Sequence, residues 1–121
     1  MKRMGKYLYA IVGGSGDRTY GPIGINGGVV HTLSNGSVAA VVSDIADQRI
    51  RPERSKLAAH HAVVKRLMED TTILPVAFGT IADSPQAVRK ILKENSGDFV
   101  EQLERVRGKV EMGLRVAWDV P

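Results

Sequence analysis

The sequence predicts an α+β fold: a ferredoxin-like two-layer sandwich, with a mostly antiparallel sheet and the helices packed on one face. Three observations predict it. Five segments have the apolar runs or alternation of strands, and two have helical periodicity. A strong turn signal joins two of the strands. The resulting order of strand, hairpin, helix, strand, helix and strand favours helices gathered on one side of an antiparallel sheet.

The first three strands are expected in the first 45 residues. Tyr7–Val12 is rich in β-forming residues, and Val29–Leu33 and Val38–Ile45 are two further apolar runs. Between these runs lies Ser34-Asn35-Gly36-Ser37. Because Asn-Gly tolerates the two positive φ angles of a tight primed turn, we expect a hairpin here.

Helical period begins at Arg54 and continues to Asp70, where the apolar stripe consists of Leu57, Val64, Leu67 and Met68. His60 lies beside this stripe on the helical wheel. We therefore expect a partly buried imidazole bonded to backbone or to a carboxylate.

A second helix is expected to start at Pro85, because Ser84 can cap the free amides and proline suits the first helical position. Its apolar positions stay in phase across Asn95-Ser96-Gly97 and continue to Val106, and Gly108 ends it. One kinked long helix or two consecutive short ones would bury the same stripe.

Two more strands are expected in the second half of the chain. Residues 73–81 form an apolar run that should be irregular, because Pro75 lacks a donor and Gly79 permits a bulge or a close contact. Residues 110–118 alternate with a period of two, which predicts one buried face. The opposite face carries Glu111, Arg115 and Asp119, as an ion pair across that face or as a surface for another protein.

Composition indicates one domain in a reducing compartment. The 121 residues are 43% hydrophobic, enough for one compact core. Cysteine is absent, which excludes disulfides, thiolate metal sites and a cysteine nucleophile. The basic start leads into too short an apolar run for a signal peptide or a membrane span, so we expect a soluble, cytoplasmic protein without a membrane partner.

The net charge of +4 is concentrated between Arg49 and Arg66, a segment that contains six basic residues and one acidic residue, Glu53. Such a patch can attract nucleic acid, but a solvated linker and helix start is the favoured interpretation. Two Phe, three Tyr and one Trp offer little surface for stacking bases. We expect no nucleic-acid partner.

The glycine-rich segment 13–28 does not match a nucleotide-binding loop. A dinucleotide fingerprint needs three glycines and a helix at its end, whereas Thr19 occupies the third position and Pro22 follows. A Gly-Lys-Ser/Thr triplet is also absent. We expect a flexible connector here and no cofactor site.

Other chemistry-bearing patterns are weak. His60 and His61 are adjacent, so they would point about 100° apart on a helix and cannot easily share a metal ion. No serine, lysine or histidine has a spacing that argues for nucleophilic catalysis. We assign no catalytic, cofactor-binding or metal-binding residue and expect no enzyme.

Five stretches together resemble the amino-terminal half of the gas vesicle accessory proteins of the L/F type. The most specific are the Leu-Pro-Val-x-Phe-Gly-Thr block within residues 73–80 and the Lys-Val-Glu strand within residues 108–119. The others are Tyr7–Val12, Ser37–Ser43 and Leu57–Val64, in the family's order. In one departure, Ala77 stands where the family often has Arg.

The resemblance implies a non-enzymatic structural or assembly role in gas vesicles, through contact with the shell protein and other accessory proteins. It also implies that residues 1–121 form a single domain corresponding to the family's amino-terminal domain, with the carboxy-terminal domain absent. An exposed apolar or strand-edge surface would suit this role, and the candidate contact residues are Pro75, Phe78, Gly79 and Thr80. An exposed strand edge of this kind would also allow self-association of the chain.

The alternative hypothesis belongs to a different functional class. The chain would be a small ferredoxin-like regulatory module that binds a metabolite or a partner enzyme, with the glycine-rich segment as a lid. Such a site needs a concave pocket with convergent polar groups, and the sequence does not show one.

Overall fold

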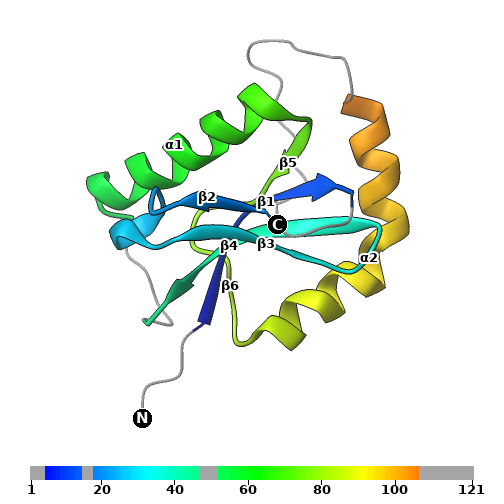
Figure 1. Ribbon diagram of the computed structural model, residues 1–121, viewed down its shortest axis with the longest axis horizontal. Helices are drawn as coiled ribbons and strands as arrows, with labels where there is room; N and C mark the ends of the chain where they lie inside the picture. The colour runs from blue at the N-terminus through cyan, green and yellow to red at the C-terminus, as the bar shows by residue number, and fades with distance from the viewer. Residues whose placement is uncertain (1–4, 15–17, 47–51, 107–121) are drawn as a thin grey trace.

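The computed structural model describes residues 5–14, 18–46 and 52–106, which form one antiparallel sheet and two long helices (Figure 1). In chain order the elements are β1 (Gly5–Gly13), β2 (Thr19–Gly21), the 3-10 helix η1 (Ile25–Gly27), β3 (Val30–Ser34), β4 (Val38–Ile45), α1 (Arg54–Asp70), β5 (Ile73–Pro75), β6 (Ile81–Ala82) and α2 (Pro85–Val106).

The sheet has the order β2-β3-β4-β1-β5, and β6 also pairs with β1. Every pairing in it is antiparallel. The long central pair of β1 and β4 is flanked on one side by the hairpin partner β3 and on the other by the short strands β5 and β6. The predicted α+β class with an antiparallel sheet is therefore confirmed.

The placement of both helices on one face is wrong: α1 and α2 lie on opposite faces of the sheet (Figure 1). Val63 and Leu67 of α1 belong to one hydrophobic cluster, and Val88 and Leu92 of α2 belong to another. Neighbouring residues of β4 alternate between these two clusters. The physical reason is that β1 and β4 are apolar at consecutive positions, so that both faces of the sheet need a cover.

The predicted hairpin joins β3 to β4, with a difference in its turn. Gly36 has a positive φ of 103°, whereas Asn35 does not. The Asn35 side-chain Oδ1 instead accepts hydrogen bonds from the amides of Ser37, at 3.0 Å, and Val38, at 3.1 Å. The turn is stabilised by this side-chain cap in place of a second positive φ angle.

The second predicted helix is one continuous helix, α2, which bends along its length (Figure 1). As expected, it is capped by Ser84, whose Oγ accepts a hydrogen bond from the Ala87 amide at 3.1 Å. The first helix has the predicted bounds but a different buried stripe, because Met68 is 59% exposed and His60 is buried in its place. Neither helix, within the described ranges, is long and apolar enough to cross a membrane.

Charges on α1 are partly paired. Lys56 lies 2.9 Å from Glu53, and Arg66 lies 2.8 Å from Asp70 one turn away. Lys56 is half-buried and its partner Glu53 exposed, while Arg66 and Asp70 are both exposed, so these pairs fit the expected solvated start and surface of a helix.

Two loop regions differ in detail from what the sequence predicts. The irregular strand expected over residues 73–81 is divided into β5 and β6, with Pro75 at the end of β5. The glycine-rich segment is not only a connector, because it contributes the edge strand β2 and the turn η1. The strand expected at 110–118, with Glu111, Arg115 and Asp119, lies outside the described residues.

Two glycines allow a matched test of this packing. A Cβ added at Gly24 would lie 2.6 Å from the Tyr9 hydroxyl and 2.9 Å from the Gly28 carbonyl, whereas one at Gly97 meets nothing within 4 Å. Gly24→Ala should therefore lower the free energy of unfolding by about 1–3 kcal/mol. Gly97→Ala, in a helix, should raise it by about 0.5–1 kcal/mol. Urea denaturation of both variants checks this, and an unchanged stability of Gly24→Ala would contradict the close packing.

Candidate protein-contact site

The loop of residues 76–80 connects β5 to β6 and is held at both ends by the central strand. The Val76 amide donates to the Tyr9 carbonyl at 3.0 Å, and the Leu8 amide donates to the Thr80 carbonyl, also at 3.0 Å. The residues between these two anchors belong to neither β5 nor β6, so they form a short loop along the edge of the sheet. We name residues 76–80 the edge loop.

The candidate contact residues lie on or beside the edge loop. Gly79 is exposed, whereas Pro75, Phe78 and Thr80 are half-buried. The φ angle of Gly79 is +91°, a value that L side chains rarely adopt. The Thr80 hydroxyl donates to the Ala77 carbonyl at 2.9 Å, which closes the loop on itself. The structure thus brings the four residues together on one short turn at a sheet edge.

Phe78 is anchored by two buried rings. Its ring centroid lies 6.1 Å from that of Tyr7 and 5.7 Å from that of His60, both in edge-on arrangements. The side chain packs against the hydrophobic cluster on the α1 face of the sheet. One side of the ring is therefore fixed by the core while the other side reaches the surface.

Tyr7 connects the edge loop to α1 through its hydroxyl. This oxygen accepts a hydrogen bond from the Gly79 amide at 3.0 Å and lies 2.8 Å from Nδ1 of His60. Of these two partners only Nδ1 can accept the hydroxyl proton, because an amide only donates, and this assignment places the imidazole proton on Nε2. In this assignment His60 is the neutral tautomer that accepts from Tyr7.

Burial favours the neutral form of both partners. Burial is the main cause that lowers the pKa of His60, the charge of His61 acts in the same direction, and a backbone hydrogen bond with Val76 opposes them. Burial raises the pKa of Tyr7 to about 12, against the effect of the Gly79 hydrogen bond. His60 is 4% exposed and has the expected hydrogen bond to the backbone. Its side-chain partner is a tyrosine hydroxyl, whereas the sequence suggested a carboxylate as the alternative to the backbone.

Tyr9 has a parallel role further along β1. Its hydroxyl accepts from the Ile25 amide at 2.9 Å and lies 2.7 Å from the Ser43 hydroxyl. It therefore ties η1, and with it the glycine-rich segment, to the sheet. Neither tyrosine was predicted to organise its surroundings, although two tyrosines within an otherwise aliphatic strand were the available signal.

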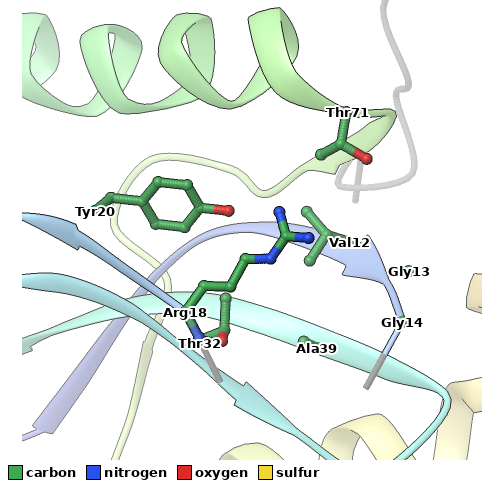
Figure 2. A pocket seen from close by; sticks show the side chains of 8 residues that line it. All are labelled: Val12, Gly13, Gly14, Arg18, Tyr20, Thr32, Ala39 and Thr71. Carbon is green, nitrogen blue, oxygen red and sulfur yellow. Dashed lines mark hydrogen bonds between the residues drawn. The ribbon is translucent and has the colours of Figure 1, made fainter. Parts of the chain in front are cut away.

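The glycine-rich segment borders a small hollow, into which the Arg18 side chain points (Figure 2). Its volume is about 90 Å³, and it is lined by Val12, Gly13, Gly14, Arg18, Tyr20, Thr32, Ala39 and Thr71. Sites for metabolites usually enclose about 300–1,000 Å³. The hollow therefore gives little support to a metabolite-binding module. Within the described residues, no group of three or more metal-ligating side chains comes together.

Comparison with known protein families gives a match to the family described as gas vesicle synthesis protein GvpL/GvpF, over residues 5–121. The chain is 33% identical over 119 residues to gas vesicle protein F of Streptomyces sp. (strain CB03234), covering 96% of this chain and 50% of that protein. It is 31% identical to gas vesicle protein L of the same strain, covering 92% and 47%. It spans about half the length of these relatives.

Two solved structures have a similar fold. The crystal structure of gas vesicle protein GvpF from Anabaena sp. PCC7120 has a TM-score of 0.77 at 21% identity, covering 87% of this chain and 46% of that one. GvpF from Microcystis aeruginosa has a TM-score of 0.73 at 24% identity, covering 86% and 44%. At these identities the likeness concerns the fold alone.

The lowered pKa of His60 predicts a stability that falls in acid. Below the unfolded-state value of 6.5 the unfolded chain takes up a proton at His60 before the folded chain does, so the free energy of unfolding decreases as the pH falls. The slope from this one group is at most about 1.4 kcal/mol per pH unit. Urea denaturation from about pH 8 to about pH 5 measures it.

The control is the neighbouring exposed imidazole. His60→Gln should remove most of this pH dependence. His61→Gln should keep the larger part of it, because burial and not the charge of His61 is the main cause of the lowered pKa of His60. An equal slope in the two variants would show that the buried imidazole does not titrate as described.

Proposed function

The chain belongs to the GvpL/GvpF family of gas vesicle synthesis proteins, and from this premise we propose that it is a non-enzymatic structural or assembly protein of gas vesicles. It acts by contact with the shell protein and with other gas vesicle accessory proteins, at the gas vesicle or in the cytoplasm around it. Residues 1–121 correspond to the amino-terminal domain of the family. The observation that carries this proposal is the family match over residues 5–121, together with relatives named for gas vesicles.

We further propose that the edge loop and Pro75 are the surface of contact, with Phe78, Gly79 and Thr80 as the residues that touch the partner. Three features support this surface. The edge loop lies at the edge of the sheet, its apex residue Gly79 is exposed, and the aromatic ring beside it is half-buried. Aromatic side chains that are fixed on one side and open on the other are frequent anchors in protein interfaces.

Contact through side chains is favoured over addition of a strand. The edge strands of the described sheet are short, with three residues each in β2 and β5 and two in β6, and Pro75 lacks an amide proton. Short edges that carry proline give few hydrogen bonds to an added strand. Self-association through a sheet edge is accordingly the weaker form of the proposal.

Two substitutions on the edge loop test this surface. Phe78→Ser removes the ring, and Thr80→Lys adds a charge beside it while leaving the backbone bond from Leu8 to the Thr80 carbonyl. Each should lower capture of co-expressed shell protein by at least about tenfold, as expected for loss of an interface anchor. Retention on an affinity resin measures it, and repeating the assay with each accessory protein identifies which component is bound.

The matched control is Met68→Ser, which removes an apolar side chain that is 59% exposed on α1, about two helical turns beyond His60. This variant should capture as the unaltered chain does. Circular dichroism reports whether each variant is folded. Undiminished capture by folded Phe78→Ser and Thr80→Lys would exclude the edge loop as the surface.

A further inference from the structure

The Tyr7 hydroxyl links three regions of the molecule: β1, from which it comes, α1 through His60, and the apex of the edge loop through Gly79. We infer that Tyr7 is the positioning residue of the edge loop: its hydroxyl, oriented by His60, holds Gly79 and thereby presents Phe78 in the shape that a partner recognises. The inference rests on the proposed function, because it takes the edge loop to be the contact surface.

The edge loop depends on bonds from outside itself. Regular pairing with β1 ends at Pro75 and resumes at Ile81. The Val76 and Thr80 anchors fix the two ends, and the bond between Thr80 and Ala77 is internal to the loop. At the apex, the Gly79 amide is bonded to the Tyr7 hydroxyl. This bond ties the most exposed residue of the loop directly to the core.

The backbone at the apex needs such a restraint. Gly79 has a φ of +91°, and glycine moves between positive and negative φ at little cost. A glycine at the apex would therefore allow several loop shapes in the absence of an external bond. The hydrogen bond to Tyr7 selects one of them. The loop is then ordered before the partner binds, so the cost of ordering it does not reduce the affinity.

His60 determines the direction of the Tyr7 hydroxyl. With the assigned tautomer, Nδ1 accepts the hydroxyl proton and the lone pairs of the oxygen remain available to the Gly79 amide. The same two rings also contact Phe78 edge-on. One pair of buried side chains thus fixes two successive residues of the edge loop, the backbone of Gly79 and the ring of Phe78.

Tyr9 provides a control that the chain itself contains. Both tyrosines are fully buried, both belong to the cluster on the α1 face, and their ring centroids are 4.9 Å apart. The Tyr9 hydroxyl bonds the Ser43 hydroxyl and the Ile25 amide, both of which lie outside the edge loop. Replacement of either tyrosine by phenylalanine removes one hydroxyl and keeps the ring, so a merely structural role predicts similar effects.

The experiment compares Tyr7→Phe with Tyr9→Phe in the whole chain. Amide exchange followed by NMR and capture of co-expressed shell protein are measured for both, with thermal unfolding as the reference. Tyr7→Phe should speed exchange at Gly79 by about tenfold, the value for one lost hydrogen bond to a buried hydroxyl, and reduce capture several-fold. Tyr9→Phe should speed exchange at Ile25, leave Gly79 protected and leave capture unchanged.

The outcomes separate this inference from the proposed function. Two results overturn the positioning role. One is an equal exchange rate at Gly79 in the two variants. The other is that Tyr7→Phe captures shell protein as well as Tyr9→Phe does, while Phe78→Ser does not. If Phe78→Ser and Thr80→Lys both capture normally, the proposed surface fails, and Gly79 exchange alone then decides the role of Tyr7. If Tyr7→Phe does not fold, the exchange rate of the Gly79 amide in the unaltered chain tests the inference. Exchange as slow as that of the strand amides supports it, and exchange as fast as that of an open loop overturns it.

Discussion

The burial of β1 on both faces is the constraint on which the rest of the structure depends. Its residues from Tyr7 to Val12 are 0–7% exposed, and it lies between β4 on one side and β5 with β6 on the other. A strand in this position needs a helix above it and another below it. α1 and α2 supply these covers, and each short strand of the second half is located by its pairing with β1. Changes in this strand therefore reach both hydrophobic clusters and the edge loop at once.

A bulge in β1 determines which of its residues belong to each cluster. The register with β4 shifts between Leu8 and Ala10, so Tyr9 is an additional residue opposite the partner strand. Without the shift, strict alternation would place Tyr7, Tyr9 and Ile11 on one face. With it, Tyr9 and Ala10 both belong to the cluster on the α1 face, and Ile11 joins the opposite one. The bulged residue is also the one whose carbonyl holds Val76 at the start of the edge loop.

Local signals predicted local structure well, because they act within a few residues. Ser84 caps α2 as expected, and Asn35-Gly36 turns the β3–β4 hairpin. The predicted placement of both helices on one face was wrong because the periodicity of a segment shows which of its residues are buried and not which element covers them. The uninterrupted apolar runs in β1 and β4 did carry the signal for two covers. β2 has only three residues, and its place is fixed by its pairing with β3, which no local pattern reports. In the same way, Pro75 and Gly79 marked the edge loop, whereas Tyr7 and Gly79 are 72 residues apart and His60 is 53 residues from Tyr7.

The chemistry of the Tyr7–His60 pair suits a scaffold for contact better than proton transfer. A general acid or base works best when its pKa lies near the operating pH. Here burial moves the pKa of His60 below its ordinary value and that of Tyr7 up to about 12, so the two values move apart and both groups stay neutral. Both side chains are almost fully buried, with their hydrogen-bonding atoms directed at each other and at the loop backbone. A neutral, satisfied pair keeps one geometry across the neutral pH range, which is the property that the proposed contact surface on the edge loop requires.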